Sequence, residues 1–347
     1  VETGRLDVDA DLVGAEWLQD LRARGEDQVV QAALAGGVQA PRQPRDRQQA
    51  RPGGQPRQAP FMAQLGQRYV RVALPYIAAL VVAILCTELA RRWMAHSSLS
   101  APPGLWQFVS HALLLHTLLG VESLSAGVWY VAIDFQLFTL AVLLWAGVRA
   151  LPRAGQRVAQ AAVVLGAAAS LWVFNRMPGL DMWAVYFFGA YALGMMAFWA
   201  VRAPRAGAWL AAMAVLGGVA LLIDFRGRVV VALLTALCLV TLLRSRRLRA
   251  WHGVAPLVQL GQMSYSVFLV HFSVCLLVNA VVSHLWPASP VPNALGMLLA
   301  FALSLAAGRQ LYLRVERHVP SWTTALRWQM GLVGAGMLVA VSSGNWA

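Results

Sequence analysis

From Arg68 onward, long runs of apolar residues alternate with short polar loops. An α-helix needs about 20 apolar residues to cross a hydrocarbon core about 30 Å thick, and most of these runs have that length. The runs are continuous and do not alternate between apolar and polar positions, which excludes the strands of a membrane β-barrel. The pattern therefore predicts an all-α polytopic membrane protein with about nine transmembrane helices. They are expected at about 73–92, 128–148, 158–174, 182–200, 207–223, 229–243, 256–282, 293–313 and 327–342.

Two stretches fall outside this pattern. The apolar segment 105–119 contains His111 and His116, and its length is about half that of a span, so we expect it not to cross the membrane fully. Residues 1–60 are rich in Arg, Gln, Pro, Gly and Ala and hold few large apolar side chains. Such a tail cannot bury enough apolar surface to offset the loss of chain entropy, so we expect it to be disordered.

Composition agrees with a membrane protein. Hydrophobic residues make up 59% of the chain and charged residues 12%, whereas soluble domains carry roughly 25% charged residues. The formal net charge of +13 comes entirely from arginine, because the chain has no lysine. A basic excess can indicate a nucleic-acid partner, but here the arginines lie in short loops between apolar runs. We therefore predict no nucleic-acid partner and an integral membrane protein, with the lipid bilayer around it and its basic loops in the cytoplasm.

Asp134 lies in the apolar stretch VWYVAIDFQLF, residues 128–138. With a helix that starts near residue 128, its carboxyl group is about 9 Å from the non-cytoplasmic end of the helix. An aspartate at the centre of a span costs about 2.5–3.5 kcal/mol on insertion scales. Two interpretations stay open: Asp134 faces a polar cavity with a catalytic role, or it makes a structural hydrogen bond to another helix.

His271 lies in a second stretch with polar residues, GQMSYSVFLVHFSVC. A helix there places Ser264, Phe268, His271 and Cys275 on one face. An intramembrane histidine is a candidate proton carrier, but it can equally be a neutral imidazole bonded to a neighbouring helix. We expect Asp134 to lie about 9 Å nearer the non-cytoplasmic surface than His271, so that the two share a cavity without a direct bond.

Arg68 and Arg71 stand on one face just before the first expected span. Guanidinium groups suit phosphates, so the pair could bind an anionic substrate, or it could act only as a cytoplasmic anchor that fixes topology. No spacing typical of metal ligands occurs in the sequence, so no metal site is predicted.

Four stretches of the chain together resemble one family of membrane enzymes. RYVRVALPY resembles the basic, proline-containing start of its third span, and VWYVAIDFQLF resembles its Trp–x–x–x–Val–Glu–x–Gln–Phe–Tyr pattern, with Asp134 at the acidic position. QMSYSVFLVHF resembles its Ser–Tyr–Ser–x–Tyr–Leu–x–His–Phe stretch, and LYLRVERHVP its closing Tyr–x–x–x–Glu–x–Pro segment. In this order and spacing the chain resembles acyltransferase family 3, whose membrane enzymes O-acylate surface polysaccharides and related glycans.

The resemblance implies a function, a set of site residues and a division of the chain. Residues 61–320 would be the acyltransferase-like domain, and 321–347 would add a C-terminal transmembrane helix. An acyl group, most simply acetyl, would pass from acyl-CoA to a hydroxyl of a cell-surface or periplasmic glycan, with no bound cofactor. Asp134 and His271 would be catalytic. The residues expected to bind substrate are Arg68, Arg71, Trp129, Ser264, Tyr265 and Glu316.

The chain departs from the family at its start. The family's usual proton acceptor is a histidine in the first span, whereas here residues 1–60 stand where two spans are expected and no histidine precedes His96. Either the tail is not the natural start and resembles a high-GC gene read in the wrong frame, or the chain is a truncated relative without acyltransferase activity. A further alternative is a proton-coupled transporter or flippase, because intramembrane Asp and His also mark proton pathways.

Overall fold

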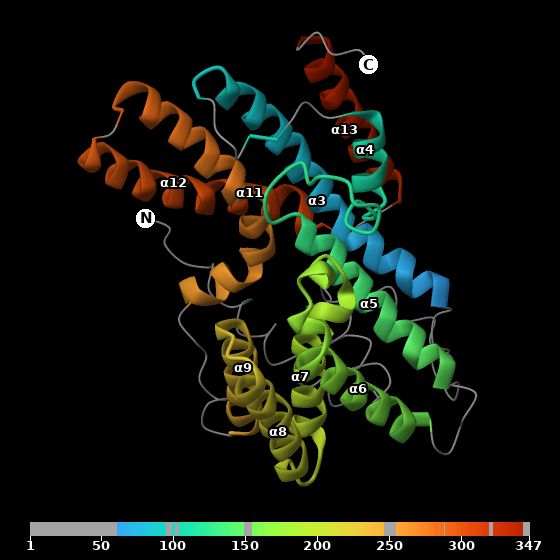
Figure 1. The fold of residues 1–347 in the computed structure, drawn as a ribbon. Helices are drawn as coiled ribbons and strands as arrows, with labels where there is room; N and C mark the ends of the chain where they lie inside the picture. Colours follow the sequence, from blue (N-terminus) through green and yellow to red (C-terminus); the bar gives the residue numbers. More distant parts are fainter. Residues whose placement is uncertain are drawn as a thin grey trace, which may run out of the picture. The chain divides into compact units, whose positions relative to one another are not determined.

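The computed structural model describes most of the chain beyond residue 60 (Figure 1). The predicted disordered tail, residues 1–60, lies outside the described residues and stays a prediction. Within the described part there are helices and turns but no strand, which confirms an all-α polytopic membrane protein. The described ranges are 61–94, 99–100, 104–148, 155–245, 255–287, 289–318 and 322–342.

Each predicted span corresponds to a helix, and the half-length segment begins with a short one. Long helices are expected because backbone groups in a bilayer must be hydrogen-bonded within the chain. Proline is the first residue of the helix that begins at Pro290, where the missing backbone N–H leaves no helical hydrogen bond unmade. The helices are α3 (Phe61–Arg91), α4 (Leu105–Ala112), α5 (Trp129–Val148), α6 (Gly155–Trp172), α7 (Ala184–Arg202), α8 (Gly207–Ile223), α9 (Gly227–Arg244), α11 (Ala255–Leu285), α12 (Pro290–Leu311) and α13 (Trp322–Ser342), with the 3₁₀ turns η2 (Phe174–Arg176) and η3 (Pro178–Leu180) and the π-turn η4 (Tyr312–Glu316).

Seven helical segments in the described ranges are long and apolar enough to cross a membrane: α3, α5, α6, α7, α9, α11 and α12 with η4. This is fewer than the nine expected spans. Helix α8 has 17 residues and is apolar but short. Helix α13 has 21 residues, but Arg327 and Gln329 fall in its first half, which leaves a shorter apolar stretch. Helices α8 and α13 are therefore present as helices but are not among the segments long and apolar enough to span a membrane.

The chain divides into two compact units. The first unit contains the second half of α5, α6, most of α7, α8 and α9, within 138–172 and 189–252. The second contains nearly all of α3, then α4, the start of α5, η2 and η3, α11, α12, η4 and α13, within 65–137, 173–188 and 253–347. In the first unit, the Arg244 guanidinium donates to the carbonyl oxygen of Ala203 at 2.8 Å and so caps the end of α7. All the predicted site residues belong to the second unit.

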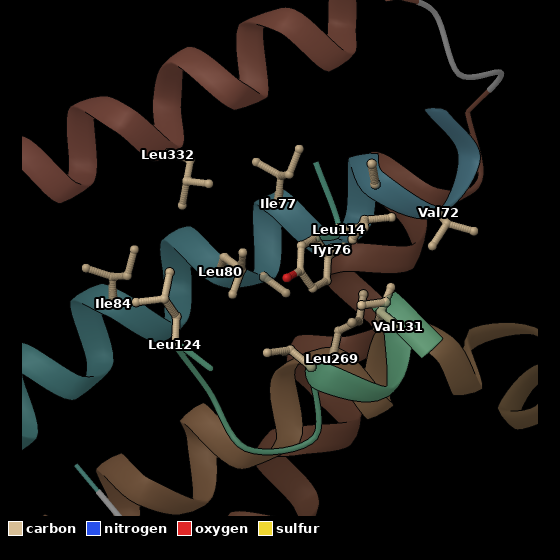
Figure 2. Close-up of a cluster of buried hydrophobic side chains, with 14 of the residues drawn as sticks. Val72, Tyr76, Ile77, Leu80, Ile84, Leu114, Leu124, Val131, Leu269 and Leu332 are labelled. Carbon is tan, nitrogen blue, oxygen red and sulfur yellow. The ribbon is translucent and has the colours of Figure 1, made fainter. Parts of the chain in front are cut away.

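The core of the second unit forms along one face of α3. Tyr76, Ile77 and Leu80 are fully buried and pack with side chains from the half-length segment, α5, α11 and α13. Figure 2 shows the ring of Tyr76 in the middle of this cluster, near Leu114. Helix α3 is therefore the central support against which the elements that carry the site are fixed.

Helices α11 and α12 approach each other so closely that a side chain would not fit between them at Gly308. A Cβ atom there would lie 2.4 Å from the Cγ2 atom of Val267 and 2.7 Å from its Cα atom. Because backbone atoms cannot yield as a flexible side chain can, glycine is required at this contact. The close contact sets the position of η4, which follows α12 directly.

Candidate functional site: a polar cluster on α3, α5, α11 and η4

An ion pair joins two of the predicted site residues. Arg68 Nη2 on α3 donates to Asp134 Oδ2 on α5 at 2.7 Å. The arginine side chain is 11% exposed and the aspartate side chain 32% exposed, so the pair is part-buried with the carboxylate at its open side. A charge-assisted bond of this length is strong. The polar partner of Asp134 is thus a charged group on another helix, and the carboxylate also remains accessible.

The ion pair corrects the predicted depths of these residues. Arg68 and Arg71 were expected in a cytoplasmic loop before the first span, with Asp134 toward the opposite surface. Instead α3 begins at Phe61, both arginines lie inside it, and Arg68 and Asp134 are at the same level. The prediction was wrong because hydropathy marks where a helix becomes apolar, and the residues before that point are helical as well.

Tyr69 fixes the orientation of α3 around its own axis beside this pair. Its hydroxyl donates to the carbonyl oxygen of Ala112, at the end of α4, at 2.5 Å. Gln329 Nε2 on α13 donates to the same hydroxyl at 2.8 Å, and the Tyr69 ring stacks on Trp322 with centroids 5.9 Å apart. Contacts on both sides of Tyr69 therefore hold its neighbour Arg68 toward α5.

Glu316 is the second carboxylate of the cluster. Its Oε2 atom accepts a hydrogen bond from Ser266 Oγ on α11 at 2.5 Å, and Ser266 is fully buried. Arg71, one turn along α3 from Arg68, lies close enough to Glu316 for an electrostatic attraction. The π-turn η4 therefore ends with a carboxylate between α3 and α11, and the cluster contains two arginines and two acids.

Tyr265 lies close to three of these four charges. Its electrostatic neighbours are Asp134, Arg68 and Glu316. Its hydroxyl donates to the carbonyl oxygen of Val72 at 3.0 Å, which ties α11 to α3. The predicted substrate-binding tyrosine is therefore within the cluster, with its hydroxyl hydrogen directed to the backbone.

Ser264 does not join the cluster. It is exposed, and its hydroxyl donates to the carbonyl oxygen of Gly261 one turn earlier on α11, at 2.9 Å. Two residues along, Ser266 has the buried position beside Glu316. Residues two apart on a helix point in different directions. Steps of three and four residues back from His271 lead to Ser264 and not to Ser266, so the sequence pattern predicted the wrong serine.

Trp129 and His271 belong to an adjoining aromatic group. Trp129 packs near Phe187, and Tyr130 packs edge-on against Phe268, with centroids 5.9 Å and 6.4 Å apart respectively. Phe268 in turn lies 6.0 Å from the ring of His271. Because Asp134 is one turn beyond Tyr130 on α5, the Tyr130–Phe268 pair stands between the two predicted catalytic residues. No direct bond between them was expected, and the part of the chain that the structure describes contains none.

The ring of His271 is oriented by its own helix. Its Nδ1 atom lies 2.7 Å from the carbonyl oxygen of Phe268. A carbonyl oxygen can only accept, so Nδ1 carries the hydrogen of this bond. The bond to a neighbouring helix that we considered from the sequence is not the one formed, and Nε2 takes no part in the bond to Phe268.

The half-length segment contains a second polar group for which the sequence suggested no role. His111 and His116 are fully buried, and their rings stack in parallel with centroids 4.0 Å apart. His111 Nδ1 bonds the carbonyl oxygen of Gln107 at 2.7 Å, and Nε2 accepts from the backbone N–H of Leu124 at 3.1 Å. Burial lowers the pKa of His111 to about 4 and that of His116 to about 3, and the neighbouring His111 lowers the latter further. Both rings are therefore neutral near pH 7.

Comparison with known families identifies the chain. A family model described as an acyltransferase domain matches residues 54–309, which is most of the chain. The chain belongs to acyltransferase family 3. No curated protein and no solved structure matches it.

The acyltransferase domain contains most of the polar cluster. Arg68, Asp134 and His271 fall within the matched residues, whereas Glu316 and α13 follow the end of the match. This membrane acyltransferase therefore has the ion pair in its family domain, with the second carboxylate supplied just beyond it. The predicted boundary at residue 320 and the roles of individual site residues remain predictions.

Proposed function

We propose that this membrane acyltransferase transfers an acyl group, most simply acetyl, from acyl-CoA to a hydroxyl of a cell-surface or periplasmic glycan. The observation that carries the proposal is the Arg68–Asp134 ion pair, which is part-buried among apolar helices and has Tyr265, Ser266 and Glu316 nearby. Charged groups at such positions are costly in a membrane, and they are usually retained for function. We further propose that the protein lies in a bacterial inner membrane with its basic loops in the cytoplasm, where acyl-CoA is available.

The two arginines suit the donor. Acyl-CoA carries several phosphate charges, and planar guanidinium groups bind phosphate oxygens through paired hydrogen bonds. Arg68 is paired with Asp134 and Arg71 is attracted to Glu316. Donor phosphates would therefore compete with carboxylates for these arginines, so donor binding and the arrangement of the acids are coupled.

The acids and His271 suit the proton transfer. When the glycan hydroxyl attacks the thioester carbonyl, an oxygen–carbon bond forms and the carbon–sulfur bond breaks. The hydroxyl proton must pass to a base and the departing thiolate must gain a proton. Asp134 uses Oδ2 for Arg68, which leaves Oδ1 to accept a hydroxyl hydrogen, and the neutral His271 ring with its hydrogen on Nδ1 would offer Nε2 as an acceptor. These two residues are our candidates for the base.

The proposal is tested with membrane vesicles that contain the full chain, radiolabelled acetyl-CoA and surface polysaccharide from the source bacterium, from which O-acyl groups have been removed by mild alkali. Transfer is measured as alkali-labile label on the polysaccharide. Asp134→Asn should reduce transfer on the order of 100-fold while the protein stays in the membrane. Asp224→Asn is the matched control, because Asp224 also pairs with an arginine, Arg226, but lies in the other compact unit.

The alternatives predict different results. An inactive relative gives no label on the polysaccharide with the wild-type chain. A proton-coupled transporter loses its activity when an uncoupler dissipates the proton gradient and has no requirement for acetyl-CoA. Full transfer by Asp134→Asn would refute the catalytic interpretation of the cluster and leave the ion pair as a structural contact.

A further inference from the structure

The buried polar atoms of the half-length segment are not explained by the cluster around Arg68. His116 has an exposed fraction of 0%, and neither of its ring nitrogens has a hydrogen-bond partner among the described residues. The hydroxyl of Tyr76 on α3, also 0% exposed, likewise has no partner. The rings of Tyr76 and His116 are stacked, with planes 17° apart and centroids 6.5 Å apart. Buried polar groups are almost always paired, because leaving them unpaired costs free energy.

The surrounding contacts hold His116 in place without satisfying it. His111 stacks on one face of the ring and is itself fully bonded, so it cannot exchange partners with His116. The next residue, Thr117, accepts from Gln136 Nε2 of α5 at 2.9 Å, which fixes the segment to that helix. The imidazole of His116 is therefore held in one position, and its one hydrogen-bond donor and one acceptor have no partner among the described residues.

We propose that His116 and Tyr76 form a subsite that binds a hydroxyl group of the acceptor glycan, and this proposal rests on the function proposed above. A sugar hydroxyl both donates and accepts, which matches the neutral imidazole and the phenol. A site that hydrogen-bonds a substrate hydroxyl through buried groups also discriminates strongly against acceptors that lack it, because the groups then stay unpaired. The pair would thus be a specificity determinant for the glycan.

The subsite lies beside the proposed catalytic residues. Tyr76 lies eight residues beyond Arg68 on α3, which is about 12 Å along the helix axis. The half-length segment contacts both regions, because the carbonyl oxygen of Ala112 accepts from Tyr69, next to Arg68, and Thr117 accepts from Gln136, two residues beyond Asp134. An acceptor bound at His116 would therefore lie near Asp134, one of the two candidate bases.

Access to the subsite requires movement of the segment that covers it. Leu114, two residues before His116, has φ of 57°, a left-handed conformation that is unfavourable for a leucine. Leu114 is 1% exposed and packs over Tyr76 (Figure 2). The left-handed backbone of Leu114 therefore costs free energy in the closed segment. We expect it to open at Leu114 when the acceptor enters.

The test uses the purified full-length chain in lipid nanodiscs, acetyl-CoA, and fragments of the O-deacylated surface polysaccharide as the acceptor. In His116→Phe, which keeps an aromatic ring in the stack, the KM for the fragments should rise about 10- to 100-fold. The KM for acetyl-CoA should change by less than about twofold, because the donor site is separate. Tyr76→Phe should act in the same direction, and His116→Gln, which keeps a donor and an acceptor, should be closer to wild type.

Thermal unfolding separates this role from a structural one. Because the phenylalanine variants remove unpaired buried polar atoms, their melting temperatures should be equal to or higher than that of the wild type. Ser304→Ala is the control, since Ser304 also has a buried hydroxyl without a partner, but on α12. It should leave both KM values unchanged. An unchanged acceptor KM in His116→Phe, or a parallel rise of both KM values with a lower melting temperature, would overturn the proposal.

Failure of the parent proposal is recognisable separately. If the wild-type chain transfers no acetyl group to the fragments, the proposed function fails, and the subsite is tested by ligand-induced stabilisation alone. A rise in melting temperature with fragments for the wild type but not for His116→Phe would support the subsite. No rise for the wild type would refute it.

Discussion

Replacement of Asp134 by asparagine, with Arg68 still charged, should lower the free energy of unfolding by about 2 kcal/mol. Removing one partner of a fully buried ion pair costs about 3–5 kcal/mol, whereas exposed pairs contribute about 0.2–1 kcal/mol. The side chains here are 11% and 32% exposed, which places the pair between these limits. Solvent screening at the open side of the carboxylate removes part of the larger value.

A double-mutant cycle isolates the interaction from other effects of each change. Arg68→Gln, Asp134→Asn and the double variant are compared by reversible unfolding in mixed detergent micelles. We expect a coupling energy of about 1.5 kcal/mol, with the double variant more stable than the sum of the two single changes predicts.

Asp224 and Arg226 provide the control pair, with side chains 42% and 19% exposed. They are two residues apart, so the contact can persist in the unfolded chain, and their coupling energy should be below about 0.5 kcal/mol. If Arg68 and Asp134 prove additive within about 0.5 kcal/mol, the ion pair contributes nothing to stability and our reasoning is wrong.

Two further predictions concern packing and pH. Gly308→Ala should lower the free energy of unfolding by about 1–3 kcal/mol, because its Cβ atom would meet the backbone of Val267. Gly261→Ala on α11 is the control and should not be destabilising, because nothing lies within 4 Å of a Cβ atom there. Equal effects of the two substitutions would contradict the close contact. The folded-state pKa values of His111 and His116, about 4 and about 3, lie below the unfolded value of about 6.5, so the unfolded chain binds more protons and stability should fall as pH drops below about 6.5. The free energy of unfolding, measured from pH 7 to 4, should fall with a slope that approaches about 1.4 kcal/mol per pH unit for each histidine. His116→Phe should remove the contribution of one histidine to this slope. An unchanged slope in this variant would contradict burial of a neutral His116 ring.

The fold follows from hydropathy to a large extent. The positions of α5 and α8 were predicted within about one residue, because their apolar runs end at charged, glycine or proline-rich loops. The start of α3 was missed by 12 residues, since FMAQLGQRYVRV is less apolar than the span but favours a helix. Hydropathy predicts which part of a helix lies in the membrane, whereas helix propensity decides how far the helix continues outside the apolar part.

The site could be predicted only in part, because its key contacts join residues far apart in the chain. The intramembrane charge of Asp134 was visible from the sequence, but its partner Arg68 is 66 residues away, and no local periodicity indicates such a contact. Ser266 and its bond to Glu316 were missed for the same reason. His116 was noted as part of a half-length segment, but only the three-dimensional packing shows that its nitrogens are buried without partners.

The π-turn that ends in Glu316 has a consequence for how this carboxylate is found in other chains. In η4 the backbone N–H of Arg317 donates to the carbonyl oxygen of Tyr312 at 2.8 Å, five residues back, so the turn holds one residue more than an α-helical turn. If the same residues formed a plain α-helical turn instead, the acid would be rotated by about 100° away from Ser266. The acid would then face another direction although its neighbours in sequence were unchanged. A relative with a plain α-helix here would need its acid one position earlier in the sequence to keep the same bond. Residues that occupy the same place in the two structures would then be offset by one position in a sequence alignment.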